Sequence, residues 1–284
     1  MMNGKQLNVS SLISVVIPCF NDGQFVEQAV YSALNQTYPN IEVIVVDDGS
    51  NSETKQVLKI LELKITRLIT QENQGQSKAR NIGIKEAKGE YILVLDSDDF
   101  SEPTFCEKAM HILTSDMDTK IVSCYANLIL ENGITTRFEP QGGSIKDFLF
   151  FNQSLGTSMF KKEDWAFCGG YDETMRNGFE DWEFFIRLLK NGGTAKVIKE
   201  PLYNYRKRLS STTSIANKNK YELLNYILLK HKELYINNYE LTIMHLLNKA
   251  EREEKEKIKN NERLEFKIGR TILIPIRWVK SLLK

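Results

Sequence analysis

The sequence predicts an α/β protein with a mostly parallel sheet flanked by helices and a helical C-terminal extension. Two observations support this prediction. Short apolar, β-branched runs alternate with segments of helical periodicity through the first half of the chain. From about residue 217 the chain becomes amphipathic and then charge-dense. We therefore predict one main domain over residues 1–216 and a helical extension over residues 217–284.

The first half of the chain alternates between strand and helix patterns. Ser14–Pro18 and Ile41–Asp47 are apolar runs typical of buried strands, and the helical pattern of Phe25–Leu34 lies between them, with Asn21 or Asp22 available as its N-cap. The same alternation continues through a helix at 53–63, a strand at 67–70, a helix at 76–87 and a strand at 91–95. Strands joined by such crossovers run parallel.

The segment after Pro103 is less regular and predicts a mixed continuation of the sheet. The turn residues Glu131-Asn-Gly133 separate two apolar runs, as in a hairpin. The expected elements are a helix to 114, strands at 121–130, 134–138 and 157–161, and a helix at 181–190.

Composition excludes several classes of protein. Of the 284 residues, 26% are charged and 42% hydrophobic, which is typical of a globular chain. The net charge of +1 argues against a duplex nucleic acid partner, because such binding depends on neutralising phosphates. The apolar run Leu12–Ile17 is too short for a signal sequence or a membrane span, so we expect a cytoplasmic protein. The four cysteines lie far apart and are expected to be reduced core residues.

Polar clusters follow three of the predicted strands. They are Cys19–Asp22, Asp47–Ser50 and Asp96–Asp99. In parallel sheets, ligands bind beyond the carboxyl ends of the strands. We therefore expect all three clusters to line one binding site.

The Asp96-Ser-Asp98 motif, with Asp99 next to it, places several carboxylates together. Mg²⁺ or Mn²⁺ uses one or two such groups and completes its shell with water and diphosphate oxygens, so it would neutralise a diphosphate leaving group. An Asp-rich turn that caps the following helix fits the same residues.

The other two clusters suggest a nucleotide site. A carboxylate of Asp47-Asp48-Gly-Ser50 could accept a uracil N–H or bind a ribose hydroxyl, although an Asp-Gly turn has the same pattern. The residues around Pro18 and Asn21 could line the base pocket. Gly75 precedes a helix with Lys78 and Arg80 in its first turns, where backbone N–H groups and cations favour an anion, although solvated surface cations are common.

The run Gly178-Phe-Glu-Asp-Trp182 begins a helix with an apolar face. Asp181 or Glu180 would be an ordinary N-cap there. A carboxylate aimed at the nucleotide site could also take a proton from the hydroxyl group of a second substrate. The two roles are compatible at a helix N-terminus.

Taken together, five motifs resemble glycosyltransferase family 2 in their order and spacing: Val15–Asn21, Val45–Ser50, Gly75–Asn81, Ile92–Asp99 and Phe179–Trp182. This resemblance implies a GT-A fold with a Rossmann-like sheet, an inverting single displacement, and a donor that is usually a UDP-sugar with Mg²⁺ or Mn²⁺. It covers roughly residues 14–211.

The resemblance also implies roles for individual residues. Those expected to bind the nucleotide are Pro18, Phe20, Asn21, Asp48, Lys78, Arg80 and Asp96, with Asp98 as the metal ligand. Asp181 matches the catalytic base, and Glu180 would help to bind the acceptor. Arg206, Arg208 and Ser211 resemble a late loop over the diphosphate, but family members often have histidine where Arg208 stands.

Sugar transfer onto a glycan or lipid-linked acceptor of a bacterial surface is therefore the first hypothesis. A sugar-phosphate nucleotidyltransferase is a second, but the loop Cys19–Gly23 lacks the basic residue it would need. A non-catalytic nucleotide-sugar-binding module is a third. No Gly-x-Gly-x-x-Gly after a strand and no Walker A motif occurs. The apolar and basic segment 268–284 could contact a membrane surface, or form a core or dimer helix.

Overall fold

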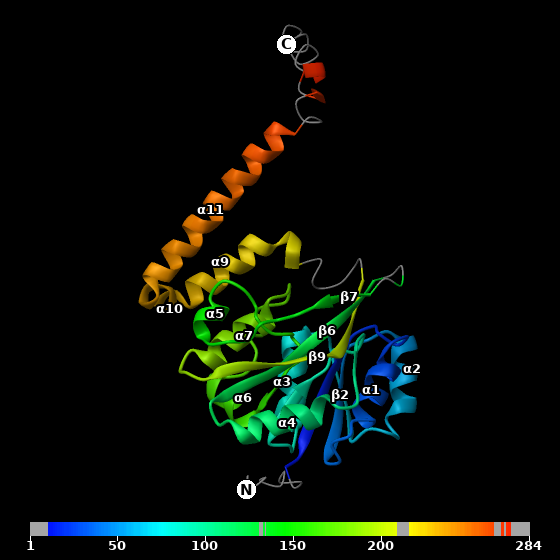
Figure 1. The fold of residues 1–284 in the computed structure, drawn as a ribbon. Coiled ribbons are helices and arrows are strands. Elements are labelled where there is room, and N and C mark those ends of the chain that lie inside the picture. The colour runs from blue at the N-terminus through cyan, green and yellow to red at the C-terminus, as the bar shows by residue number, and fades with distance from the viewer. Residues whose placement is uncertain are drawn as a thin grey trace. The chain divides into compact units, whose positions relative to one another are not determined.

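The computed structural model describes residues 11–130, 133, 135–208, 216–263, 268–269 and 271–273. The chain divides into two compact units, residues 1–230 and residues 231–284. The first unit contains the sheet and its flanking helices (Figure 1). The arrangement of this sheet determines where the predicted site residues meet.

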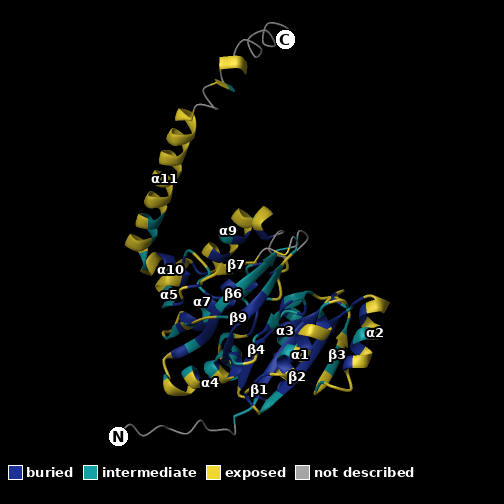
Figure 2. Cartoon of the chain, turned by 45° about the vertical axis from the view of Figure 1, so that its right-hand side comes forward, coloured by how far each residue is buried: buried dark blue, intermediate teal, exposed yellow. Residues whose placement is uncertain are grey.

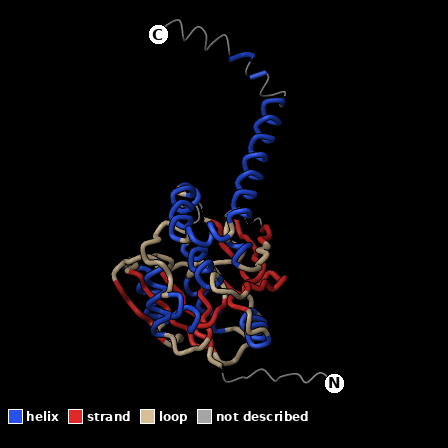
Figure 3. The backbone as a smooth tube through the Cα atoms, turned by 90° about the vertical axis from the view of Figure 1, so that its left-hand side faces the viewer, coloured by secondary structure: helices blue, strands red, loops and turns tan. Residues whose placement is uncertain are grey.

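The first half of the sheet has the predicted alternation of strand and helix. Figure 3 shows the strands and helices of the whole chain in two colours. Its elements are β1 (Ile13–Cys19), α1 (Val26–Leu34), β2 (Ile41–Asp48), α2 (Ser52–Leu61), β3 (Arg67–Gln71), α3 (Gln76–Glu86) and β4 (Tyr91–Val94). β1 pairs in parallel with both β2 and β4, and β2 pairs in parallel with β3. The prediction of a parallel sheet is confirmed for this half.

The second half adds strands of mixed direction. Its elements are β5 (Phe100–Ser101), α4 (Phe105–Ser115), β6 (Thr119–Leu130), β7 (Thr135–Phe138), α5 (Ile145–Phe148), β8 (Met159–Lys161), α6 (Lys162–Cys168), α7 (Glu180–Leu189), β9 (Thr194–Lys207) and α9 (Lys220–Lys230). The strand order is β3-β2-β1-β4-β8-β6-β9-β5, and β7 pairs with β6. Because β8 is antiparallel to both β4 and β6, the predicted mixed continuation is confirmed.

β9 is the longest strand described, and the sequence pattern did not reveal it. Charged residues and Pro201 interrupt its apolar periodicity. In the structure, the pairing of β9 with β6 shifts register on both sides of Tyr125, and Pro201 lies at this irregularity. A bulge tolerates a proline that a regular ladder would not.

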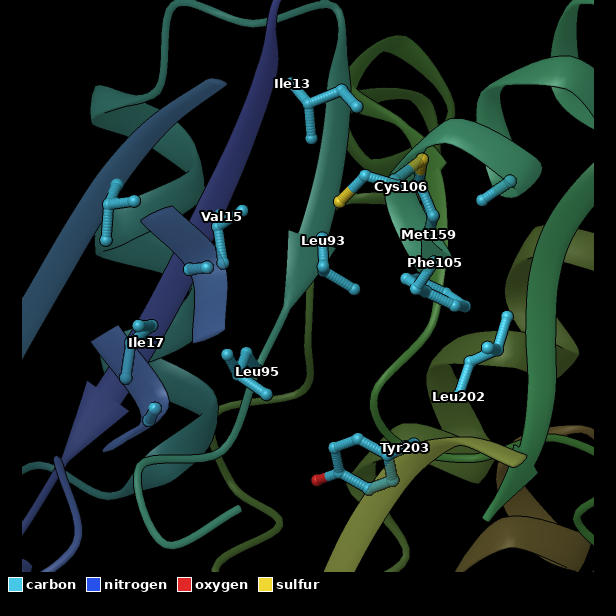
Figure 4. Close-up of a cluster of buried hydrophobic side chains, with 14 of the residues drawn as sticks. Ile13, Val15, Ile17, Leu93, Leu95, Phe105, Cys106, Met159, Leu202 and Tyr203 are labelled. Atoms are coloured by element: carbon cyan, nitrogen blue, oxygen red, sulfur yellow. The ribbon is translucent and has the colours of Figure 1, made fainter. Parts of the chain in front are cut away.

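Helices cover both faces of the sheet. Alternate residues of β1, such as Val15 and Ile17, face the core made with α1, α2 and α4, and Figure 4 shows this cluster. Val16 faces the other side, where a Cβ on Gly83 of α3 would lie 2.4 Å from its side chain. Figure 2 shows the resulting buried strands between more exposed helices. The close approach of α3 fixes the residues that this helix carries toward the site.

The predicted N-cap of α1 is wrong. The helix begins at Val26 after a turn in which the Asp22 carbonyl oxygen accepts the N–H groups of Phe25 and Val26 at 2.9 Å each. No side chain caps it. The side chains of Asn21 and Asp22 instead bond to neighbouring loops, because those loops offer donors at the same edge of the sheet.

Three of the four cysteines, Cys19, Cys106 and Cys124, are buried and all four are free thiols, as expected, whereas Cys168 is partly exposed. The second unit contains α10 (Lys232–Asn237) and α11 (Tyr239–Glu262). Within the described residues, no helix combines the length and the apolar character needed to cross a membrane. Ser211 and most of the segment 268–284 lie outside the described residues, so the predictions on them stay predictions.

Candidate active site

The polar clusters after β1, β2 and β4 meet at one edge of the sheet. Cys19 pairs with Asp47 across β1 and β2, while Val16 pairs with Val94 across β1 and β4. The Ser50 Oγ accepts a hydrogen bond from the Asn21 N–H at 3.0 Å, and the Asn21 Oδ1 accepts one from the Asn51 N–H at 2.7 Å. These bonds hold Asn21 at a positive φ of 59°, a conformation that asparagine tolerates better than most residues.

Asp48 organises the loop that leads into α3. Its Oδ1 accepts hydrogen bonds from Gln71 Nε2 at 2.6 Å and from the Gln74 N–H at 2.8 Å, and its Oδ2 accepts one from the Gly75 N–H at 2.9 Å. Of the other residues expected around the base, Pro18 is buried within β1 and Phe20 is 47% exposed just beyond it. Phe20 is thus available to a ligand, while Asp48 shapes the surrounding backbone.

We expect Asp48→Asn to lower the free energy of unfolding by about 2 kcal/mol, because hydrogen bonds to a charged acceptor contribute about 1.5–3 kcal/mol each. In either orientation, the asparagine NH₂ group faces a backbone N–H that now donates a hydrogen bond to the carboxylate, so two donors oppose each other. Urea unfolding measures the change. Asp118→Asn, at an exposed position, is the control. Equal stability of the two variants would contradict this role of Asp48.

Arg80 of α3 lies at the centre of a buried charge network. Its side chain is 2% exposed, and its Nη1 and Nη2 contact Glu180 Oε1 and Asp96 Oδ1 at 2.8 Å each. Burial alone would lower the Arg80 pKa, but the charges of Asp96 and Glu180 raise it above its ordinary value. The guanidinium therefore joins the acidic strand end to the start of α7.

Two neighbours complete the surroundings of Arg80. The Tyr171 ring is fully buried with its centroid 5.3 Å from the guanidinium carbon, in cation–π contact. Gln76 Nε2 donates to Asp96 Oδ1 at 3.0 Å. Lys78, expected to bind an anion, pairs with Glu173 at 2.8 Å, and its side chain is 32% exposed.

Arg208, the residue that follows β9, makes ionic contacts with both Asp98 and Asp22. Arg208 Nη2 contacts Asp98 Oδ2 at 2.5 Å, and its Nη1 contacts Asp22 Oδ1 at 2.9 Å. Asp22 Oδ2 also accepts a hydrogen bond from the Ser97 hydroxyl at 2.7 Å. Arg208 thus links the loop after β1 to the acidic motif after β4.

The acidic motif carries more negative charge than its surroundings neutralise. Burial and the charge of Asp96 raise the pKa of Asp98 to about 6, although Arg208 opposes the shift. Burial and the charge of Asp98 raise the pKa of Asp99 well above its usual range, even though Tyr203 and the Arg206 N–H donate hydrogen bonds to it. The Tyr203 ring lies at the border of the core in Figure 4.

This excess charge suits a cation. Among the residues that the structure describes, no three Asp, Glu, His or Cys side chains are grouped so that they alone could hold a metal ion. A divalent cation held jointly with a diphosphate needs only one or two carboxylates. The carboxylate oxygens of Asp98, next to the negative charge of Asp96, fit that arrangement.

Arg206, expected in the diphosphate loop, lies in the strand β9, one residue before its end. Its guanidinium carbon is 5.1 Å from the centroid of the Phe25 ring and 4.9 Å from that of Phe100. It donates to the Asp98 carbonyl oxygen and to Gln28. In this conformation Arg206 braces the backbone of the acidic motif.

Asp181 stands in the first turn of α7, next to Glu180. Asn152 Nδ2 donates to its Oδ2 at 2.9 Å, and the Trp182 N–H donates to its Oδ1 at 2.8 Å. Burial and the charge of Glu180 raise the pKa of Asp181 to about 7, with Arg80 opposing the shift. A carboxyl group with such a pKa can accept a proton near neutral pH.

The start of α7 differs from an ordinary capped helix. Phe179 is the N-cap residue at a positive φ of 63°, and no side chain caps the helix. The alternative role of Glu180 or Asp181 as N-cap is therefore wrong. A bulky residue at positive φ is strained, and such strain is concentrated at functional sites.

Sequence reasoning assigned no individual role in this site to four residues: Asp22, Gln76, Asn152 and Tyr171. Asp22 follows Asn21 directly, but its pattern also matched a helix cap. Asn152 and Tyr171 lie in irregular segments, where periodicity carries no signal. Their contacts with Asp181 and Arg80 arise from the folding of distant segments onto each other.

Comparison with known proteins gives consistent results. The family described as Glycosyl transferase family 2 matches residues 14–164. An uncharacterized glycosyltransferase of Haemophilus influenzae is 30% identical over 239 residues, which cover 81% of this chain and 79% of that protein. The glycosyltransferase GlyG of Streptococcus pneumoniae is 31% identical over 206 residues, which cover 69% of this chain and 59% of GlyG.

Solved structures share the fold. The crystal structure of S. aureus TarS 1-349 in complex with UDP-GlcNAc matches with a TM-score of 0.60 and 20% identity, over 72% of this chain and 60% of TarS 1-349. A second crystal structure of S. aureus TarS 1-349 matches with a TM-score of 0.61 and 19% identity, over 77% of this chain and 64% of that chain. The sheet and its flanking helices thus have a GT-A-like fold. With more than half of its length matched by the family, this chain belongs to glycosyltransferase family 2.

Proposed function

We propose that this chain transfers a sugar from a nucleotide diphosphate donor, UDP-linked, to a hydroxyl group of a glycan or lipid-linked acceptor in bacterial surface polysaccharide synthesis. The transfer inverts the anomeric carbon and depends on Mg²⁺ or Mn²⁺. The reaction takes place in the cytoplasm or at the inner face of the cell membrane.

One observation supports this proposal above the others. The chain Asp98–Asp96–Arg80–Glu180–Asp181 runs from the acidic strand end to the start of α7, through two ion pairs of 2.8 Å centred on Arg80. Through Asp96 and Glu180, the Arg80 guanidinium therefore connects the strand end that carries Asp98 to the helix turn that carries Asp181. A sugar donor and an acceptor hydroxyl would meet between them.

In the proposed reaction Asp181 acts as general base. Asn152 and the Trp182 N–H each occupy one lone pair of a different carboxylate oxygen, which leaves a further lone pair on each. As the acceptor oxygen bonds to the anomeric carbon, its proton passes to Asp181 and the bond from that carbon to the diphosphate breaks. The attack from the face opposite the leaving group inverts the configuration.

The remaining roles concern the donor. The Asp98 carboxylate would hold a divalent cation, which would neutralise the charge that develops on the diphosphate leaving group. For that contact Arg208 would leave Asp98, and its guanidinium could then bind a phosphate. Phe20 and Asn21, beside Asp48, would line the nucleoside, and a UDP-sugar donor agrees with the UDP-GlcNAc of the TarS complex.

The family match favours sugar transfer over nucleotidyl transfer. A non-catalytic binding module would bind the same ligands as the proposed enzyme but would form no product. Formation of a glycosylated acceptor with release of UDP separates these two alternatives.

A thermal-shift panel of nucleotide sugars with and without Mn²⁺ is expected to identify the donor. A ligand at 100 times its Kd adds about 2.7 kcal/mol to the free energy of unfolding. We expect one UDP-sugar to raise the Tm only with the metal, and Asp98→Asn to abolish the metal-dependent part of the rise. Asp118→Asn, at an exposed position, should respond like the wild type.

Either of two results would count against the proposal. If no nucleotide sugar raises the Tm, the donor class is wrong. If Asp98→Asn responds to metal as fully as the wild type does, Asp98 is not the metal ligand, and the metal assignment would have to move to another carboxylate.

A further inference from the structure

The helix that carries Asp181 contains a second, fully buried carboxylate. Glu183 of α7 is 0% exposed and lies one helical turn after Glu180. Arg187 Nε donates to both of its oxygens at 2.8 and 3.0 Å, and Arg187 Nη2 contacts Oε2 at 2.6 Å. Lys230 Nζ, from α9, contacts Glu183 Oε1 at 2.9 Å. A buried carboxylate requires such partners, because an uncompensated buried charge is costly.

Lys230 also holds the segment that precedes α7. Its Nζ contacts Asp172 Oδ2, which accepts a further hydrogen bond from the Tyr226 hydroxyl at 2.7 Å. Burial alone would raise the Asp172 pKa, but the hydrogen bonds from Lys230, Thr174 and Tyr226 lower it below its ordinary range. One ammonium group of α9 thus joins the segment 169–178 to α7.

The segment 169–178 in turn supports the Arg80 network. Tyr171 packs against the Arg80 guanidinium, and Asn81 of α3 holds its backbone through bonds of 2.8 Å to the Tyr171 N–H and 2.9 Å to the Tyr171 carbonyl oxygen. Arg187 donates to the carbonyl oxygens of Cys168 and Gly170. Arg187 therefore binds the backbone just before Tyr171, and Lys230 binds the side chain just after it.

We propose that Lys230 is a positioning residue for the transfer reaction, and that α9 belongs to the catalytic unit. Through Glu183, Lys230 fixes the first turn of α7, which presents Glu180 and Asp181. Through Asp172, it fixes the segment that places Tyr171 against Arg80. The expected effect of Lys230 on the transfer rate rests on the proposed function. Its role in fixing α7 and the segment 169–178 does not.

The test compares Lys230→Met, Lys230→Arg and the control Lys220→Met, which removes an exposed lysine from the start of the same helix. Small misplacements of catalytic groups cost up to about 100-fold in rate. We expect Lys230→Met to lower kcat at least about tenfold, with the KM for the donor changed less than about threefold, since Arg80 keeps its own two carboxylates. Lys230→Arg should restore most of kcat, and Lys220→Met should match the wild type.

Amide hydrogen exchange supplies a readout that needs no substrate. In Lys230→Met, residues 169–178 and the first turn of α7 should exchange faster than in the wild type, and in Lys220→Met they should not. If the wild type transfers no sugar at all, the proposed function fails and the exchange data still decide the positioning role.

Two outcomes would overturn the inference. One is an active Lys230→Met variant with wild-type kcat. The other is unchanged exchange in residues 169–178. The first outcome includes a variant with normal kcat per folded molecule and a lower Tm, because Lys230 would then be a purely stabilising residue.

Discussion

Asp181→Asn is expected to lower kcat by about 10³-fold, because a positioned general base contributes about 10²–10⁴-fold. Asparagine keeps the shape of the side chain and can still accept the Trp182 N–H through its carbonyl oxygen. It cannot take the proton of an acceptor hydroxyl. Donor binding should change little, because the substitution leaves Asp96 and Asp98, the carboxylates proposed to face the donor, untouched. Steady-state kinetics with saturating donor measures the change.

The pH dependence of the wild type tests the same assignment. Burial and the Glu180 charge raise the pKa of Asp181 to about 7. The base must be deprotonated, so kcat should rise with pH through about 7 and level off above it. Below that pH, kcat should fall about tenfold per pH unit as the carboxyl group becomes protonated.

Asp118→Asn, at an exposed position, serves as the control and should keep both the rate and the pH profile. Full activity in Asp181→Asn would remove Asp181 from the role of base. A wild-type profile that stays flat between pH 5 and pH 8 would point the same way.

Arg80→Met is expected to have the largest effect on stability, a loss of about 3–5 kcal/mol in the free energy of unfolding. The substitution leaves Glu180, which is 6% exposed, and Asp96 without the cation that now joins them. Glu180 is then a buried carboxylate without its cationic partner, and it repels Asp96, whose side chain is 24% exposed. Urea unfolding at neutral pH measures the loss.

A surface ion pair provides the matched control. Arg67 contacts Glu86 at 2.5 Å, but the two side chains are 52% and 38% exposed, so Arg67→Met should cost at most about 1 kcal/mol. Removing the uncompensated charges should repair the fold, so Arg80→Met combined with Asp96→Asn and Glu180→Gln should regain much of the loss. If Arg80→Met is no less stable than Arg67→Met, the buried network does not contribute as described.

The positions of the clusters at strand ends could be predicted because the cause is local. Apolar, β-branched runs form β1, β2 and β4, and the first polar residues after them must lie at the carboxyl edge of a parallel sheet. Asp48, Asp96 and Asp98 accordingly lie at the same edge of the sheet. The contact of Arg208 with Asp98 could not be predicted in this way. Pro201 and its charged neighbours interrupt the apolar pattern of β9, the strand that leads to Arg208.

The sequence by itself determined the alternating α/β order, the family and the set of charged residues at the edge of the sheet, since each depends on short-range patterns. Only the tertiary structure decided how these charges are paired. Arg80 and Glu180 are 100 residues apart, and Asp172 and Lys230 are 58 apart. A solvated lysine or arginine and one that bridges two buried carboxylates look alike in sequence, because burial by distant segments, and not the residue type, makes the pairing necessary.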